Sequence, residues 1–241
     1  MINSLVVRLK KIRRYLNACK ICLKTEGVDF FRTYYLNLHY FPIKQALLLP
    51  IFIYHNTLFT SMNGKIIIES LLSTGIFHFG RLCLGIQDIK YSRSIWDVAG
   101  TIVIKGDVTF GRGSKLSIGQ DAYFEVGNNV AASGMSEFIC HKQIILGNNC
   151  HLGWNLLIMD IDFHKIYDKD NSLLNAPKPI RIGNHIWIGC RVTIFKGVSI
   201  SDNNVIAANS VITKDIQCKN CVITSSGKEL IILKQDITWK E

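Results

Sequence analysis

The chain has few prolines and no long apolar run. Its 241 residues include 4 Pro and 18 Gly, and 48% of them are apolar. This balance excludes collagen-like and disordered chains and is typical of a globular protein. The longest apolar stretch, Ala46 to Tyr54, is short and contains Pro50, whereas a membrane-spanning helix needs ~20 apolar residues. No basic segment precedes an apolar one at the N-terminus, so we expect no secretory signal and a cytoplasmic protein.

Acidic residues are scarce. The chain has 18 Asp and Glu against 28 Lys and Arg, a formal charge of +10. Such an excess favours an acidic partner, which could be nucleic acid, an anionic membrane surface or a phosphate-bearing cofactor. The chain carries no recognised nucleic-acid-binding motif, so we do not expect nucleic acid as the partner.

The eight cysteines do not form a pattern typical of disulfides or of zinc. A disulfide framework belongs to small extracellular domains. Two Cys-x-x-Cys pairs occur, Cys19 with Cys22 and Cys218 with Cys221, but about 200 residues separate them. The pairs of a zinc ribbon are normally closer in sequence. We therefore expect reduced thiols and no metal site.

A six-residue period dominates the C-terminal half. Isoleucine recurs at Ile182, Ile188, Ile194, Ile200, Ile206 and Ile212. The residue after each is mostly small, and the residue two before each is able to face inward. A helix would require spacings of three and four. Because a six-residue unit cannot bury its own isoleucine, successive units must stack, and three short strands with tight corners per turn make a triangular parallel coil. The fold class expected is therefore all-β, a parallel β-helix.

The same period extends upstream but is less regular. It continues at Leu146, Leu152 and Ile158, and its phase slips among earlier residues, so we expect irregular early coils. Residues 160–179 interrupt the period and are expected to leave the coil as a loop, where chemistry is usually found. This gives an N-terminal extension over residues 1–62, a β-helix over residues 63–216 and a C-terminal tail over residues 217–241.

A family resemblance rests on specific strings. Residues 182–194 read Ile-Gly-Asn-His-Ile-Trp-Ile-Gly-Cys-Arg-Val-Thr-Ile, and residues 208–215 read Ala-Asn-Ser-Val-Ile-Thr-Lys-Asp. Together with residues 146–155 and 160–164, these strings resemble the hexapeptide-repeat acyltransferases, in particular the maltose, galactoside and polysaccharide O-acetyltransferase branch. The resemblance covers roughly residues 100–216. It implies a left-handed β-helix, a homotrimer, and acetyl-CoA bound in a groove between neighbouring subunits.

The resemblance also implies the catalytic residues. Transfer of an acyl group to a hydroxyl needs a base, and imidazole suits that task near neutral pH. His164 lies in the matching motif and is the expected base, with Asp162 as the carboxylate that orients its ring. The oxyanion needs donors, for which the backbone N–H groups near Gly189 and Cys190 and the side chain of Asn155 are candidates. The histidine spacings do not match those of the zinc-binding β-helix carbonic anhydrases.

A narrow slot with small residues would suit the pantetheine arm of the donor. By motif match, Gly189, Cys190 and Ala208 line this slot. Trp187 either walls it or is a core or interface aromatic. The phosphate and adenine end matches Thr213 and Lys214, and Lys228 is a candidate replacement for a basic contact that relatives carry further downstream.

The acceptor side departs from the family. Relatives carry an asparagine where this chain has Ala131-Ala-Ser-Gly134, so Ser133 is the residue available to replace it. We expect an O-acetyltransferase that acts on a saccharide hydroxyl in surface polysaccharide synthesis. One alternative is an N-acetyltransferase of an amino sugar or sugar nucleotide. The other is a non-catalytic β-helix that serves as a scaffold or binding module.

Residues 1–24 predict a basic amphipathic helix. They contain seven Lys and Arg residues and no acidic residue, while apolar residues recur at helical spacing from Leu5 to Cys19. Such a helix can bind the inner face of an anionic membrane, each cation near the surface adding about 1 kcal/mol. Alternatively, its apolar stripe packs on the end of the β-helix and caps it. The two roles are compatible.

Overall fold

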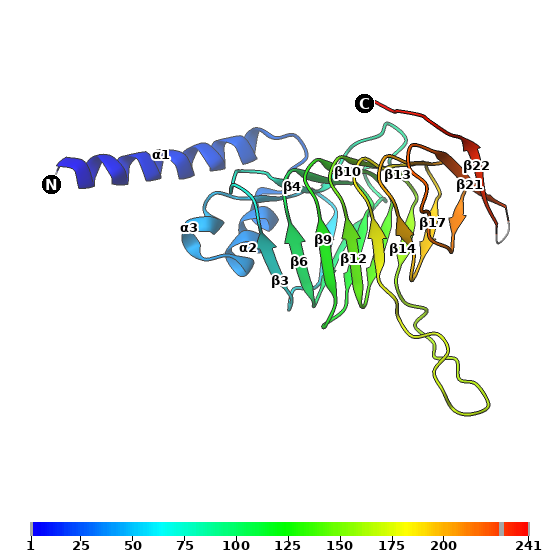
Figure 1. Ribbon diagram of the computed structural model, residues 1–241. Helices are drawn as coiled ribbons and strands as arrows, with labels where there is room; N and C mark the ends of the chain where they lie inside the picture. The colour runs from blue at the N-terminus through cyan, green and yellow to red at the C-terminus, as the bar shows by residue number, and fades with distance from the viewer. Residues whose placement is uncertain (1, 227–228, 241) are drawn as a thin grey trace.

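Three parallel sheets wind around one core in the computed structural model, which describes residues 2–226 and 229–240 (Figure 1). We call them sheets I, II and III. Sheet I contains, in spatial order, β1 (Ile51–Ile53), β4 (Phe77–Arg81), β7 (Val108–Gly111), β10 (Val130–Gly134), β13 (Cys150–Trp154), β16 (Trp187–Ile188), β19 (Val205–Ile206), β21 (Val222–Ser226) and β22 (Glu229–Lys234). Only β22 pairs antiparallel among these strands.

The other two sheets complete the triangle. Sheet II contains β2 (Thr57–Ser61), β5 (Ser94–Val98), β8 (Lys115–Ile118), β11 (Glu137–Cys140), β14 (Leu157–Met159), β17 (Thr193–Phe195) and β20 (Val211–Ile212). Sheet III contains β3 (Lys65–Ile68), β6 (Thr101–Ile104), β9 (Tyr123–Val126), β12 (Gln143–Leu146), β15 (Ile180–Ile182) and β18 (Ser199–Ile200). The chain visits sheets I, II and III in turn, so the predicted left-handed parallel β-helix is confirmed.

The isoleucine period fills the core as the sequence predicts. All six isoleucines of the period are at most 3% exposed. The small residue after an isoleucine is required by the closeness of the next coil. A Cβ on Gly189, for example, would lie 2.6 Å from the backbone nitrogen of Ala208.

The early coils are irregular, as expected, and their extra residues lie at the corners between strands. Val130 pairs with Val108 and with Cys150, so these coils contain 22 and 20 residues, whereas Ile188 pairs with Ile206 in a coil of 18. Strand pairing continues from coil to coil, with register shifts between Phe59 and Ser61 and between Phe79 and Arg81. Phenylalanines fill the early core, where Phe110 and Phe138 stack with ring centroids 4.7 Å apart.

The boundaries expected for the β-helix need correction at both ends. Coiling begins at β1 and β2, which pair in parallel with β4 and β5, so the first coil starts before residue 63. After residue 216, β21 still adds to sheet I by pairing with β19. The alternation of small and apolar residues is weak in both stretches, and the six-residue period therefore does not detect them.

The N-terminal end of the coil is capped by α2 (Phe30–Tyr40), and the C-terminal end of residues 1–24 also packs there, since Cys22 is buried in one cluster with Phe52 of β1. The side chain of Asn37 donates to the Ile51 carbonyl at 2.7 Å and accepts from the Ile51 N–H at 3.1 Å. Thr33 bonds both backbone groups of Ile53 in the same way. These contacts satisfy the outer edge of β1, which would otherwise present unpaired backbone groups. The short helix α3 (Ile43–Ala46) follows α2.

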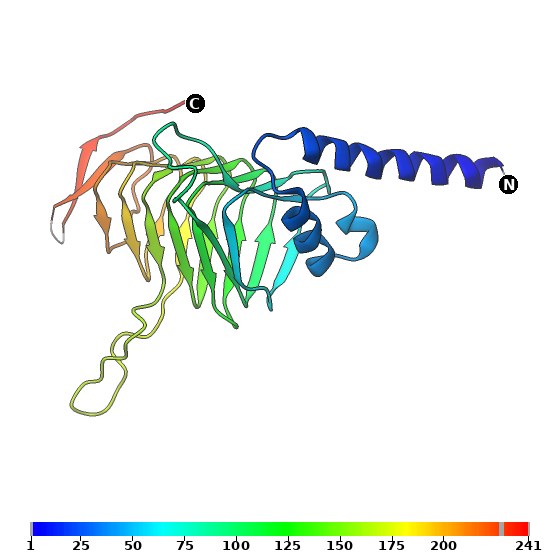
Figure 2. The same cartoon turned by 180° about the vertical axis from the view of Figure 1, so that it is seen from behind.

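Helix α1 (Ile2–Lys24) projects from the coil stack along its long direction (Figures 1 and 2). Near its C-terminal end, Cys22 is buried in a small cluster with Leu49, Phe52 and Tyr54. Further out, the stripe residues Leu9, Ile12 and Leu16 are each more than half exposed. No helix in the described part of the chain is both long and apolar enough to cross a bilayer.

Candidate functional site

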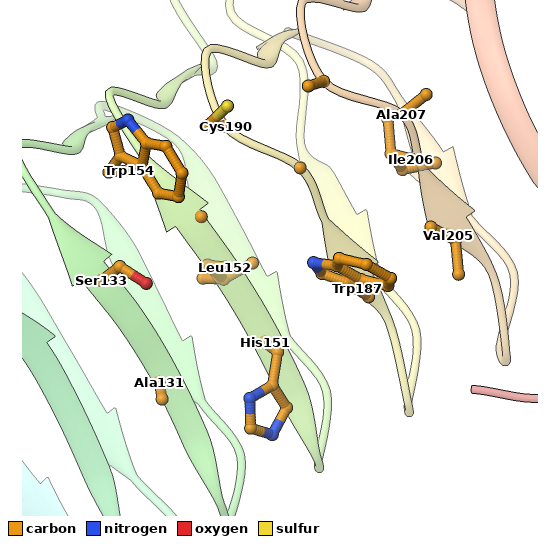
Figure 3. Close-up of a pocket in the computed structure, with 13 residues that line it drawn as sticks. Ala131, Ser133, His151, Leu152, Trp154, Trp187, Cys190, Val205, Ile206 and Ala207 are labelled. Carbon is orange, nitrogen blue, oxygen red and sulfur yellow. The ribbon is translucent and has the colours of Figure 1, made fainter. Parts of the chain in front are cut away.

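A pocket of about 520 Å³ opens on the outer face of sheet I (Figure 3). Its floor comes from β10, β13, β16 and β19, and its rim from the corner that joins sheet I to sheet II. We call it the sheet I pocket. The residues that line it are Ala131, Ser133, His151, Leu152, Gly153, Trp154, Trp187, Gly189, Cys190, Val205, Ile206, Ala207 and Ala208.

Four of the residues predicted to bind the donor meet in this pocket. Trp187, Gly189, Cys190 and Ala208 all line it. Trp187 is 48% exposed, which excludes the alternative that it is a core residue of this chain. A narrow slot with small residues on its walls fits a pantetheine arm, and the volume in one chain lies in the range of small-molecule sites.

The two candidate backbone donors differ in availability. The Gly189 N–H already donates to the Ile206 carbonyl at 2.8 Å, as part of the coil-to-coil bonding. The Cys190 N–H has no hydrogen-bond partner among the described residues, and it lies at the pocket rim. Of the two, Cys190 is therefore the group available to a developing oxyanion.

Ser133, the residue expected to replace an asparagine, lines the pocket on the N-terminal side. His151, which was not among the residues expected at the site, lies on the same floor. It is on β13, beside Trp187 of β16 in the parallel register. Strand alternation predicts that both side chains face outward once the strands are known.

The C-terminal tail folds back next to the pocket. Trp239 stacks on His185 with ring centroids 4.2 Å apart, and it contacts His151 edge-on at 5.5 Å. Its indole lies 6.3 Å from that of Trp187. Trp239 thus belongs to an aromatic group at the pocket edge, which the sequence analysis missed because 54 residues separate Trp239 from His185.

The loop that carries His164 leaves a different corner of the coil. It connects β14 of sheet II to β15 of sheet III and projects away from the body (Figure 1). Asp160 fixes its base, because the buried carboxylate accepts hydrogen bonds from the N–H groups of His141, Lys142 and Gln143 at 2.7 to 2.8 Å. His164 itself is exposed.

Asp162 does not contact the His164 ring in this chain. Its carboxylate pairs with the ammonium group of Lys196 and accepts from the Asn175 amide at 3.0 Å. The same amide bonds the His164 carbonyl at 2.7 Å. The hydrogen bond from Lys196 lowers the pKa of Asp162, outweighing the opposite effect of desolvation. The expectation that Asp162 orients the imidazole is therefore corrected to a role in tying the neck of the loop.

The other predicted residues are dispersed. Thr213 and Lys214 are exposed at the corner of sheets II and III, two coils beyond the loop. Asn155 is exposed with φ +56° at the corner of sheets I and II, and it faces a shallow hollow on sheet II. It does not line the sheet I pocket. Lys228 lies outside the described residues.

The predicted site therefore divides between two corners of the triangle. The slot residues lie at the corner of sheets I and II, while His164, Thr213 and Lys214 lie at the corner of sheets II and III. One chain does not bring the two groups together. Among the described residues, no three His, Cys, Asp or Glu side chains are grouped so that they could hold a metal ion.

Part of the repeat matches a known protein family. Residues 179–214 match the family described as the hexapeptide repeat of succinyl-transferase. The match covers the part of the chain in which the six-residue period is strictest, and it agrees with the parallel coils and with the resemblance noted from the sequence.

Known proteins with similar sequences are sugar O-acetyltransferases by name. Polysialic acid O-acetyltransferase of Escherichia coli O1:K1 / APEC is 29% identical over 56% of this chain and 41% of its own length. Galactoside O-acetyltransferase of Escherichia coli K12 is 32% identical over 42% of this chain and 59% of its own. The chain thus spans about half the length of these relatives. The crystal structure of the polysialic acid-specific acetyltransferase NeuO aligns with a TM-score of 0.46 and 21% identity, covering 80% of this chain and 79% of that one.

Proposed function

We propose that this protein is an acetyl-CoA-dependent O-acetyltransferase that acts on a saccharide hydroxyl in the synthesis of a surface polysaccharide. The observation that carries the proposal is the sheet I pocket, which combines a narrow apolar slot with an unbonded N–H at Cys190. The pocket suits the thioester end of the donor. The names of the relatives support a sugar as the acceptor.

The chain's residues have distinct tasks in this reaction. His164 takes the proton of the acceptor hydroxyl as its oxygen attacks, a task for which an exposed imidazole is suited. The Cys190 N–H donates to the oxyanion that develops at the acyl carbon. Trp187, Gly189 and Ala208 hold the pantetheine arm, and Thr213 with Lys214 of another chain bind its phosphate end.

We further propose that the site is completed in a homotrimer. The slot and His164 lie on different corners of one coil, so a second chain must supply whichever group the first lacks. Cyclic symmetry repeats the same contact three times and closes the assembly. Sheet II, which lies between the two corners, then faces the three-fold axis.

Acetyl transfer with the purified protein tests the proposal. We expect release of coenzyme A from acetyl-CoA to depend on a saccharide acceptor. His164→Ala should lower kcat by 10²- to 10⁴-fold, whereas Lys165→Ala, which removes the neighbouring exposed side chain, should leave kcat unchanged. Transfer to amino sugars alone would identify an N-acetyltransferase. Absence of turnover would leave a binding scaffold, whereas turnover unchanged in His164→Ala would refute His164 as the base.

The exposed basic face of α1 also supports contact with an anionic membrane, which would bring the enzyme to a lipid-linked acceptor. Lys10, Arg13 and Arg14 are exposed on the projecting part of this helix. Flotation of the full chain with vesicles containing anionic lipid should recover the wild type, and replacement of these three residues by Gln should reduce recovery. Equal recovery of both proteins would contradict the membrane contact.

A further inference from the structure

A second pocket, of about 370 Å³, lies at the corner of sheets I and II near the N-terminal end of the coil. It forms where three coils and the α1–α2 connection meet. Tyr54 and His55 follow β1, Arg81 ends β4, and Arg112 follows β7. Glu26 contributes the acidic side chain of its lining. We call it the Arg112 pocket.

Arg112 is unusual because its guanidinium is buried without a counterion. The residue is 3% exposed. One terminal nitrogen donates to the carbonyls of His55 and Ile89, at 3.2 and 3.3 Å. Its Nε has no hydrogen-bond partner among the described residues, and no described carboxylate forms an ion pair with it. A buried charge of this kind requires compensation.

The mouth of the pocket adds positive charge. Arg81 is exposed there and also lacks an ion pair with any described carboxylate. The His55 ring is exposed and lies 3.6 Å from Asp29. Glu26 is exposed and lies more than 4 Å from both guanidinium groups, since it forms no ion pair with them. The interior of the pocket is therefore cationic. Consistent with this environment, burial lowers the pKa of Arg112.

One side chain, Gln87, bonds the backbone of a residue from each of the two pockets. The side-chain amide of Gln87 donates to the Ser133 carbonyl at 2.7 Å and to the Arg112 carbonyl at 3.3 Å. Ser133 lines the sheet I pocket. The strands before Arg112 and before Ser133, β7 and β10, are neighbours, and neighbouring strands lie about 4.8 Å apart. An acceptor that extends from the reacting centre toward the N-terminal end of the coil would reach Arg112.

We propose that the Arg112 pocket binds an acidic group, a carboxylate or a phosphate, on a sugar unit of the acceptor, which makes the acceptor an acidic saccharide. Guanidinium groups bind both oxyanions through paired N–H donors. The assignment to an acceptor rests on the proposed function. The binding of an acidic sugar does not, because it needs neither donor nor catalysis.

Calorimetric titration of the full chain without acetyl-CoA tests this inference. The probes are methyl glucuronide for a carboxylate, glucose 6-phosphate for a phosphate, methyl glucoside as the neutral sugar, and inorganic phosphate alone. We expect one or both acidic sugars to bind at least about tenfold more tightly than methyl glucoside, as the loss of a charge-assisted hydrogen bond implies. Which acidic sugar binds identifies the acidic group.

Two variants and a matched control locate the binding. Arg81→Gln should weaken binding of the acidic sugar about tenfold. Arg112→Lys should weaken it too, because an ammonium group lacks the paired N–H donors of the guanidinium group. Lys65→Gln removes one exposed charge on sheet III and should change nothing. If Arg112→Lys fails to fold, Arg81→Gln with its control still decides the question.

Three results would overturn the inference. They are equal binding of charged and neutral sugars, equal effects of Arg81→Gln and Lys65→Gln, and binding of inorganic phosphate as tight as that of either acidic sugar. Charge-selective binding in a protein without acetyl transfer would instead refute the proposed function alone. Acetyl transfer to neutral sugars, with no binding of an acidic sugar at Arg81, would refute only the proposed role of the Arg112 pocket.

Discussion

The indole of Trp239 lies flat on the imidazole of His185, with 7° between the ring planes. The indole Nε1 also donates to the His185 carbonyl at 3.2 Å. His185 occupies the corner between sheets III and I, so this contact anchors the C-terminal tail over the edge of the sheet I pocket. The tail is therefore part of the wall beside Trp187.

Trp239→Ala should loosen this wall. We expect a loss of about 1–2 kcal/mol in the free energy of unfolding, since an aromatic pair contributes about 0.5–1.5 kcal/mol beyond the area that it buries. The KM for acetyl-CoA should rise while kcat changes little. Urea denaturation and steady-state kinetics measure both effects, with Trp239→Phe as the control that keeps a stacked ring. Unchanged unfolding and KM would contradict the anchoring role.

Asp160→Ala should be among the most damaging substitutions in the coil. The carboxylate is fully buried and accepts three backbone hydrogen bonds, so its removal leaves three N–H groups without this acceptor. We expect a loss of about 3–5 kcal/mol in the free energy of unfolding. Chemical denaturation measures it. Asp121→Ala, at an exposed corner, should cost less than about 0.5 kcal/mol, and comparable losses in the two variants would refute the capping role.

Lys196→Met should release the neck of the loop that carries His164 without affecting the coil. The Lys196 ammonium group bonds the Asp162 carboxylate and, at 2.7 Å, the Asn175 carbonyl. Hydrogen exchange should become faster in residues 161–177 and stay unchanged in the strands. Lys142→Met, at an exposed position of the same corner, is the control. Protection of the loop equal to that of the wild type would show that the ion pair does not hold it.

His78 should make the protein less stable in mild acid. Burial, together with the nearby charge of Arg81, lowers the pKa of His78 from 6.5 to about 4. Between these values the unfolded chain binds a proton that the folded chain does not. The free energy of unfolding therefore has its full value above about pH 6.5 and falls as the pH drops toward 4. The loss from pH 7 to pH 5 should be on the order of 2 kcal/mol.

Substitution of His78 isolates this contribution. The Tyr54 hydroxyl contacts His78 Nδ1 at 2.8 Å, so His78→Gln keeps a polar partner while removing the titration. Unfolding by urea at several pH values should give a flatter dependence in this variant between pH 4 and pH 6.5. Parallel curves for the variant and the wild type would assign the acid sensitivity to other groups.

The sequence predicts the later coils well because their spacing is strict. Each isoleucine of the period occupies one inward position, and the glycine after it is needed where the next coil approaches, as at Gly189. The early coils were harder to predict, since extra residues at the corners shift the period, two in the turn from Val130 to Cys150 but 13 in the turn from Phe77 to Val108. The cap by α2 depends on Asn37 and Thr33, which look like ordinary helix residues until β1 is placed beside them.

The candidate site was predictable where it follows the repeat. Trp187, Gly189, Cys190 and Ala208 share one pocket because the motif fixes their positions within the coil. The partner of Asp162 was not predictable, since Lys196 belongs to the next coil and meets the loop only after residues 163–177 have left the stack. Trp239 and Arg112 contact residues that lie 54 and 57 positions away in the sequence. Local spacing does not predict such contacts. The trimer stays a prediction.

Complementation between two inactive variants tests most directly whether the site is shared between chains. His164→Ala lacks the base, and Ala208→Trp fills the slot at an exposed position. If the slot of one chain works with His164 of its neighbour, unfolding and refolding an equal mixture should restore about a quarter of wild-type activity, because each mixed trimer contains one intact site. Activity no greater than the sum of the two separate variants would contradict a shared site.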